Sequence, residues 1–127
     1  MREKLIKLLD NSYSPYSNFK VAAICKMKDG TEFNGVNVEN ASYGATVCAE
    51  RSAIFSAISN GYKKYDFDSL YIMVSGDKLS TCCFLCRQVI SEMFEKDKKI
   101  VLMSKTEEKE YTVSELCPYP FCEDDLK

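Results

Sequence analysis

Two short segments of the chain bring together residue types that bind metals and move protons. The first is Cys48-Ala49-Glu50-Arg51, and the second runs from Cys83 to Gln88 with the sequence Cys-Phe-Leu-Cys-Arg-Gln. A C-x-x-C pair at a turn that enters a helix is a common metal chelate, because both sulfurs can face one point. With Cys48 as a third thiolate, Cys83 and Cys86 would hold a tetrahedral zinc ion and leave its fourth position open for water. The spacing therefore favours a catalytic zinc site over a closed structural one.

Glu50 is the candidate proton carrier of such a site. Cys48 can lie at the helix cap, outside helical geometry, which would allow the Glu50 carboxylate to lean over the metal without binding it. A carboxylate beside metal-activated water can act first as a general base and then as a general acid. The positive ends of the two helices, together with Arg51 and Arg87, would offset the negative charge of three thiolates.

The sequence contains no histidine. This absence excludes Ser-His and Cys-His nucleophiles and every His-ligated metal, so that proton transfer must use Glu, Asp, Lys, Tyr or Cys. Seven cysteines are present, and this odd number argues against a disulfide scaffold and for a reducing compartment. The N-terminus also lacks the unbroken apolar stretch of a secretion signal, so we expect a cytoplasmic protein.

Each of these features also has a less specific interpretation. A C-x-x-C pair alone can be a redox pair or half of a structural zinc module, whose fourth thiolate would come from Cys82, Cys117 or Cys122. Glu50 alone is more often a solvated helix residue. Cys25 lies in an apolar strand and is expected to be plain core. We expect Cys117 and Cys122 to pack or to stay free thiols.

The hydrophobic pattern predicts the elements that must position these groups. We expect helices over 2–10, Cys48–Asn60 and Cys83–Phe94, and strands over Val21–Met27, Thr31–Val36, Leu70–Val74 and Ile100–Met103. One more element, of unassigned type, is expected near Tyr111–Val113. Asp29-Gly30 is a hairpin signal between the first two strands. Strands that alternate with helices later in the chain favour a layered α/β domain with parallel pairs. No repeat or linker interrupts the pattern, so residues 1–127 are expected to form a single domain.

Charge and hydropathy limit the kinds of partner that the chain is expected to bind. The net charge is −2 and the isoelectric point is near 5.2, and no basic stretch is present. A protein that holds a polyanion usually presents a basic face, so nucleic acid is not expected as a substrate. The longest apolar runs are only a few residues, so no membrane span is expected.

Five stretches of the chain resemble the cytidine deaminase family, in particular its small enzymes that act on free nucleosides. These stretches are Pro15–Phe19, Gly35–Tyr43, Cys48–Arg51, Cys83–Gln88, and Glu115–Pro118 followed by Phe121. The run Asn-Val-Glu-Asn-Ala-Ser-Tyr that begins at Asn37 is highly specific when it occurs together with Cys-Ala-Glu-Arg. The resemblance implies a three-layer α/β/α domain with a central mixed sheet of about five strands.

The resemblance also implies an activity. This is the hydrolytic deamination of cytidine and deoxycytidine to uridine and deoxyuridine in pyrimidine salvage, with one Zn²⁺ per chain held by Cys48, Cys83 and Cys86. Zinc-activated water would attack C4 of the base, and Glu50 would move the proton to N3. The three-cysteine ligand set marks the homotetrameric branch of the family, in which Phe121 would reach into a neighbouring subunit's site.

The remaining roles also follow from the resemblance. The residues expected to contact the nucleoside are Phe19 on the base, Asn37 and Glu39 on the ribose hydroxyl, the Ala49 N–H on the pyrimidine carbonyl, and Tyr16 and Tyr43 as lining. The guanidinium of Arg51 would lie beside the thiolates, without binding the metal, and would offset part of their negative charge. Spacing alone leaves a loop-stabilising role open for Asn37 and Glu39, and a core position open for Phe19.

The chain departs from the family pattern in the loop that carries two of the ligands. Cys82 replaces a usual proline and adds a thiol beside the site, and the bulky Phe84 replaces a usual glycine. These changes predict an altered ligand loop and a cysteine that could compete for metal or oxidise. Deamination of another aminopyrimidine nucleoside, of the antibiotic type, is the alternative activity.

Overall fold

The computed structural model describes residues 1–127, and its framework is one mixed sheet of five strands. The strands are β1 (Val21–Met27), β2 (Glu32–Val36), β3 (Phe67–Val74), β4 (Lys99–Met103) and β5 (Glu108–Thr112), in the spatial order β2-β1-β3-β4-β5. β3 and β4 run parallel, and every other neighbouring pair is antiparallel. The helix α3 (Phe84–Met93) makes the crossover between the two parallel strands, as such a connection requires.

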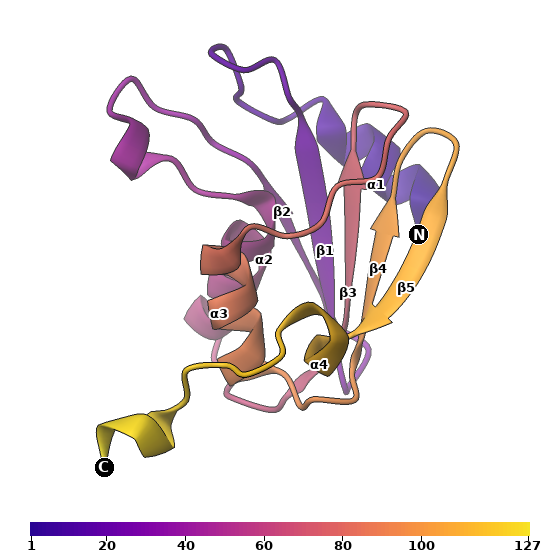
Figure 1. Cartoon of the computed structure of the whole chain (residues 1–127). Helices are drawn as coiled ribbons and strands as arrows, with labels where there is room; N and C mark the ends of the chain where they lie inside the picture. Colours follow the sequence, from indigo (N-terminus) through magenta and orange to yellow (C-terminus); the bar gives the residue numbers. More distant parts are fainter.

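Helices cover both faces of this sheet (Figure 1). α1 (Arg2–Leu9) packs on one face, and α2 (Ala49–Ser59), α3 (Phe84–Met93) and the short α4 (Val113–Leu116) lie on the other. Two short 3-10 turns, Tyr43–Ala45 and Glu123–Leu126, lie outside these layers. The predicted three-layer α/β/α fold is therefore confirmed.

β1 shows how the sequence builds two cores. Ala23, Cys25 and Met27 join the buried cluster under α2 and α3, whereas Ala22 and Ile24 join the cluster under α1. Successive side chains of a strand point to opposite faces, so a strand covered on both sides reads as a continuous apolar run. Cys25 is fully buried there, and the prediction that it is plain core is confirmed.

The predicted elements are present with shifted boundaries. β3 begins at Phe67 instead of Leu70, and the single element expected near Tyr111–Val113 is a strand, β5, followed directly by α4. β5 was hard to predict because its first three residues are charged and exposed, as suits a strand at the edge of a sheet. No helix is long and apolar enough to cross a membrane.

Gly35 brings α2 close to the sheet. A Cβ atom at this position would lie 2.4 Å from the Ala49 carbonyl oxygen and 2.4 Å from the Ala53 nitrogen. Only glycine permits this approach of two backbones. The start of α2, which carries the first of the two chemical segments, is thereby held against β2.

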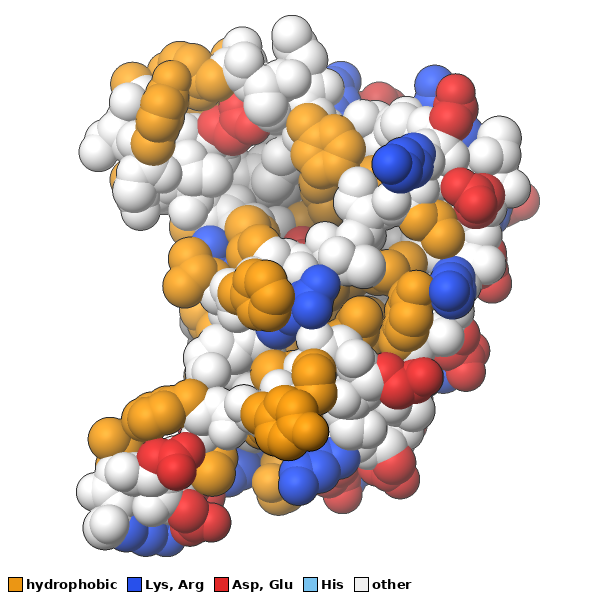
Figure 2. All heavy atoms as spheres, in the orientation of Figure 1, with side chains coloured by type: hydrophobic (Ala, Val, Ile, Leu, Met, Phe, Trp, Pro, Cys, Tyr) orange, Lys and Arg blue, Asp and Glu red, His pale blue; other side chains and the backbone are white.

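Several large apolar side chains remain at the surface. Figure 2 shows hydrophobic atoms gathered over the loops, the start of α3 and the C-terminal tail. The most exposed are Tyr43, Phe84, Leu85, Tyr119, Phe121 and Leu126. A patch of this kind on a chain of this size favours contacts with other protein surfaces.

Candidate zinc site

The three predicted metal ligands lie together at the starts of two helices. Cys48 is the N-cap of α2, Cys83 is the N-cap of α3, and Cys86 lies in the first turn of α3. Their sulfur atoms all lie within 4.8 Å of one another, and Cys48 and Cys83 are 3.6 Å apart. Tetrahedral zinc with Zn–S bonds of about 2.3 Å holds two sulfurs roughly 3.8 Å apart, so the group has the size of a zinc site.

The helix starts favour thiolates at these positions. Both N-cap cysteines have extended backbone angles, which point their side chains back over the first turn. The Cys86 N–H donates to the Cys83 sulfur at 3.4 Å. The positive end of each helix dipole further stabilises negative charge on the sulfurs.

The contacts of Cys48 favour its thiolate form. The hydrogen bond from the Cys86 thiol, aided by Arg51, lowers the pKa of Cys48 to about 5 despite partial burial. The same contact with Cys48 raises the pKa of Cys86, so the pair holds a proton that a cation would displace. Arg51 donates to the Cys48 sulfur at 3.6 Å, so its positive charge lies beside this thiolate.

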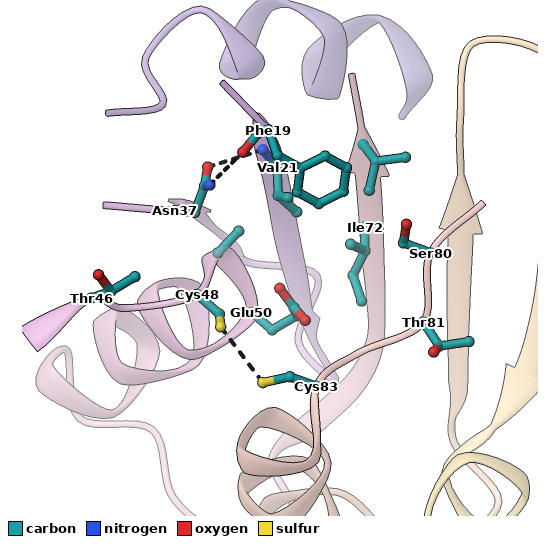
Figure 3. Close-up of a pocket in the computed structure, with 12 residues that line it drawn as sticks. Phe19, Val21, Asn37, Thr46, Cys48, Glu50, Ile72, Ser80, Thr81 and Cys83 are labelled. Carbon is teal, nitrogen blue, oxygen red and sulfur yellow. Dashed lines mark hydrogen bonds between the residues drawn. The ribbon is translucent and has the colours of Figure 1, made fainter. Parts of the chain in front are cut away.

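Glu50 lies beside these sulfurs without belonging to the ligand group. Its side chain is buried, at 5% exposure, and it points into a cavity of about 190 Å³ together with Cys48 and Cys83 (Figure 3). Burial, and secondarily the charge of Cys48, raises the pKa of Glu50. A carboxylate whose pKa is raised in this way is suited to accept a proton and to release it again.

We refer to this space as the Glu50 cavity. Its lining residues are Phe19, Val21, Asn37, Thr46, Cys48, Ala49, Glu50, Ile72, Val74, Ser80, Thr81 and Cys83. Phe19, Asn37 and Ala49 thus come together with the metal ligands, as the sequence predicted. The sequence reasoning missed Ile72 and Val74, although alternate residues at the end of an apolar strand were a signal. It also missed Ser80 and Thr81, which directly precede the ligand loop.

Asn37 uses its amide group within the chain. Its Nδ2 donates to the Phe19 carbonyl at 2.7 Å, and its Oδ1 accepts from the Val21 N–H at 2.9 Å (Figure 3) and from the Ser12 hydroxyl. These bonds hold Phe19 and Val21 against the cavity. The loop-stabilising role that spacing left open for Asn37 is therefore present, and contact with a ribose stays a prediction.

Glu39, Tyr16 and Tyr43 line a neighbouring hollow of about 290 Å³, which we call the Tyr43 hollow. Glu39 Oε1 accepts from the Tyr16 and Ser17 N–H groups at 3.0 and 3.1 Å, and the Ser17 hydroxyl lowers the pKa of Glu39. Asn37 and Glu39 therefore line two spaces instead of one. Thr46 lines both spaces, so they adjoin.

Phe121 lies away from the Glu50 cavity of its own chain. It is 56% exposed, and its carbonyl oxygen accepts from the Gln88 side chain at 2.8 Å. The tail that carries it projects from the body of the domain (Figure 1). Its predicted place in a neighbouring subunit's site stays a prediction.

Arg87 braces the ligand loop through hydrogen bonds to its backbone, and its expected part in offsetting the thiolate charge stays a prediction. Its guanidinium donates to the carbonyl oxygens of Cys82 and Leu116, at 2.8 and 2.9 Å, and to the Thr81 hydroxyl at 3.0 Å. Phe84, which replaces a small residue, is 80% exposed and stacks on Arg87, so its bulk points away from the sulfurs.

The remaining cysteines do not complete a fourth position. Cys82 is 4% exposed, and burial raises its pKa, which makes it a poor competitor for metal. Cys117 is half-buried and Cys122 is exposed, and neither belongs to the ligand group. The donor set is thus three thiols, which suits zinc with one open position.

Comparisons with known proteins agree with this site. Residues 1–104 match the family model described as cytidine and deoxycytidylate deaminase zinc-binding region. The cytidine deaminase of Halalkalibacterium halodurans is 39% identical over 125 residues, which cover 98% of this chain and 93% of the relative. That of Mycoplasma genitalium is 36% identical over 115 residues, which cover 90% and 87%.

Solved structures show the same agreement. The crystal structure of cytidine deaminase from Burkholderia pseudomallei superposes with a TM-score of 0.89 at 37% identity and covers 94% of both chains. That of the Mycobacterium tuberculosis enzyme gives 0.79 at 29% identity and covers 96% of this chain and 94% of that one. Fold and site together define a zinc-dependent hydrolase. The chain belongs to the cytidine and deoxycytidylate deaminase family.

Proposed function

We propose that this chain converts cytidine and deoxycytidine, with water, into uridine or deoxyuridine and ammonia, as a step of pyrimidine salvage. The observation that carries the proposal is the placement of three cysteine sulfurs and the buried Glu50 carboxylate on one small cavity. The relatives named cytidine deaminases, which align with nearly the whole chain, support it. We further propose that residues 1–127 act as a single catalytic domain.

The residues divide the chemistry between them. Zinc, when bound by Cys48, Cys83 and Cys86, supplies a Lewis acid that makes water more acidic. Glu50 accepts the proton of that water and passes it to N3 of the pyrimidine. The oxygen of the water bonds to C4, and Glu50 then passes the proton of the new C4 hydroxyl to the amino group, so that the C4–N bond breaks and ammonia leaves. The raised pKa of Glu50 supports this exchange, because the carboxyl group must be able to take the proton and release it.

The nucleoside is placed by the residues around Glu50. The Ala49 N–H belongs to the first turn of α2, whose N–H groups lack helical partners, and it is available for the pyrimidine carbonyl. Phe19 lies on the wall of the cavity and packs on the base. Asn37 and Glu39 take the ribose hydroxyl where the two spaces adjoin at Thr46, and Tyr16 and Tyr43 line the same side.

We also propose that the chain is a cytoplasmic homotetramer whose sites lie at subunit interfaces. The exposed Tyr43, Phe84 and Phe121 support the assembly, because they would be covered by neighbouring subunits. Seven cysteines without a disulfide support a reducing compartment. Sedimentation of the active protein tests the assembly, and a fully active monomer would contradict a site shared through Phe121.

The activity is tested by the loss of cytidine absorbance and the appearance of uridine with zinc-loaded protein. A chelator-stripped sample should be inactive and should recover when zinc is added back. A folded, zinc-containing protein that leaves cytidine and deoxycytidine unchanged would overturn the proposal. It would favour another aminopyrimidine nucleoside as the substrate. If no such nucleoside were turned over, a structural zinc module would be the remaining interpretation.

A further inference from the structure

A second cavity, of about 520 Å³, lies on the α1 side of the sheet, opposite the zinc site. We call it the α1-side cavity. Its lining residues are Arg2, Ile6, Leu9, Asp10, Asn18, Lys20, Met73, Val74, Ser75 and Lys105. They come from α1, from the segment before β1, from the end of β3 and from the turn after β4. The proposed deamination makes no use of this cavity.

The charge around the α1-side cavity is basic although the whole chain is acidic. Three basic residues and one acidic residue line it, whereas the net charge of the chain is −2. Lys20 and Lys105 take part in no ion pair, and neither does Asp10. Arg2 is tethered to the Ser104 carbonyl at 2.7 Å and to Glu108 at 3.4 Å. Two unpaired ammonium groups beside one cavity attract an anion.

The floor of the cavity has a different character. Met73 and Val74 are buried, and Ile6 and Leu9 of α1 add apolar surface beside them. Asn18 and Ser75 supply side-chain hydrogen-bonding groups. Small-molecule sites typically combine several hundred cubic ångströms of mostly apolar lining with a few polar or charged groups that fix orientation. Here four lining residues are apolar and six are polar or charged, so the lining is more polar than usual and suits a ligand with one anionic end and one weakly polar end.

We propose that the α1-side cavity binds a phosphate ester of nucleotide size. Lys20 and Lys105 contact the phosphate oxygens, and the apolar floor receives the remainder of the molecule. Lysine binds phosphate as a strong point charge, and several such contacts are needed because each is partly screened by solvent. The ligand also changes the affinity of the Glu50 cavity for a nucleoside, and this second statement rests on the proposed function.

The segment 18–21 connects the two cavities. Phe19 and Val21 line the Glu50 cavity, whereas Asn18, whose backbone is left-handed (φ 57°), and Lys20 line the α1-side cavity. Val74 lines both cavities. A ligand that binds Lys20 therefore shifts a segment in which both neighbours of Lys20, Phe19 and Val21, form part of the wall of the nucleoside site.

Hydrogen bonds hold this segment from both sides. The Lys20 N–H donates to the Ser75 hydroxyl at 3.3 Å, and the Lys20 carbonyl accepts from the Ser75 N–H at 3.0 Å. On the other side, Asn37 bonds the backbone of Phe19 and Val21. Ser75 and Asn37 thus connect each cavity to the same four residues.

Isothermal titration of the zinc-loaded protein with AMP, inorganic phosphate and adenosine tests the site. The purine base of AMP keeps the probe distinct from a pyrimidine substrate. We expect AMP and phosphate to bind, adenosine to bind at least about tenfold more weakly than AMP, and the affinity for AMP to fall as salt rises. The double variant Lys20→Gln/Lys105→Gln should bind AMP at least about tenfold more weakly.

The matched control is Lys7→Gln/Lys63→Gln, which removes the same charge from exposed lysines outside the cavity and outside any ion pair. It should bind AMP within about twofold of the parent chain, since long-range charge effects are screened. Absence of AMP and phosphate binding at millimolar concentration would overturn the site. Equal AMP binding by the Lys20/Lys105 variant, or equal binding of adenosine, would do so too.

Coupling is measured by titrating uridine, the expected product, with and without saturating AMP. The dissociation constant of uridine should change by at least about fivefold in the parent chain and should not change in the Lys20→Gln/Lys105→Gln variant. An unchanged value in the parent chain would refute the coupling. Uridine that fails to bind under either condition would count against the proposed function, while the AMP titration still decides the site.

Discussion

The metal-binding half of the site and its nucleoside-binding half are built differently. Cys86 and Glu50 are buried at the starts of two helices, with Glu50 only 5% exposed, whereas Cys48 is half-buried and Cys83 is exposed. Tyr16 and Tyr43 lie in loops and are 52% and 78% exposed. The chain by itself thus completes the reactive half of the site and leaves the substrate half open. This difference fits a site that a neighbouring subunit covers.

The two halves are also held by different forces. The close packing at Gly35 seats α2 on the sheet, so the metal half moves only if the core moves. The substrate half is held by side chains that bond nearby backbone, such as Glu39 to Tyr16 and Ser17, and Asn37 to Phe19. Substitutions in the metal-binding half should therefore abolish the catalytic step, and those in the nucleoside-binding half should weaken the binding of the nucleoside.

Replacement of a ligand should have the largest effect. Cys86→Ser keeps the size of a buried side chain but removes a soft thiolate, so zinc content should fall from one per chain to near zero. Turnover should fall more than about 10⁴-fold, because the Lewis acid is lost with the metal. Zinc analysis and a uridine-formation assay measure both. Cys117→Ser, outside the ligand group, should change neither.

Glu50→Gln should separate metal binding from proton transfer. We expect kcat to fall by about 10²–10⁴-fold, the usual contribution of a general acid–base group, while zinc content stays at the level of the parent chain. The amide has the same shape as the carboxyl group but cannot accept the proton. A variant that releases ammonia at the parent rate would refute the assignment of Glu50.

The pH profile of the parent chain should also identify Glu50 as the group that accepts the proton. Burial raises the pKa of Glu50, so the carboxylate that must accept a proton is lost at a higher pH than for an ordinary glutamate. As pH falls, kcat/KM should therefore decline with an apparent pKa above 4.5, the usual value for glutamate. An acid limb at that usual value would show that Glu50 is not the titrating base.

The two halves also differed in how far the sequence could predict them. Cys48, Glu50, Cys83 and Cys86 were predictable because helix caps and the C-x-x-C spacing fix where short side chains point. The substrate loops were less predictable, since the direction of Asn37 depends on backbone groups of Phe19 and Val21 that lie far away in the sequence.

Other misses have similar physical causes. Arg87 was expected to help offset the charge of the thiolates, but its hydrogen bonds to the carbonyls of Cys82 and Leu116 could not be predicted, because a long side chain can reach several acceptors. β5 was predicted only as a short uncertain element, because edge strands carry charges that hide strand periodicity. The layered α/β class followed from strands that alternate with helices, and the three-layer arrangement followed from the family resemblance.

Arg51→Met should have a moderate effect on zinc affinity, and it tests whether Arg51 belongs to the metal-binding half. The guanidinium donates to the Cys48 sulfur, and its loss raises the pKa of that thiol. Zinc affinity should fall by about 10–100-fold, the usual effect of removing a partner of a ligand. Competition with a chromogenic chelator measures it. Arg51→Lys, which keeps the charge, should recover part of the loss, and equal losses in both variants would refute a charge effect.

Glu39→Gln should have the smallest effect, and it tests the substrate half alone. Its amide oxygen can still accept from the Tyr16 and Ser17 N–H groups, and its amide nitrogen can donate to the Ser17 hydroxyl, which donates to Glu39 in the parent chain, so the loop should keep its shape. The charged acceptor for a ribose hydroxyl is lost, however, and a charge-assisted hydrogen bond contributes about 1.5–3 kcal/mol. KM for cytidine should therefore rise by about tenfold or somewhat more, with zinc content unchanged and kcat nearly so.

Asn37→Ala is the comparison for Glu39→Gln, because Asn37 braces Phe19 and Val21 as well as facing the cavity. It should raise KM and also lower the melting temperature, since its partners lose buried hydrogen bonds. Thermal unfolding beside steady-state kinetics distinguishes the two variants. If Glu39→Gln lowered kcat and left KM unchanged, residues of the Tyr43 hollow would affect the catalytic step and not substrate binding. The division between a reactive half and a binding half would then fail.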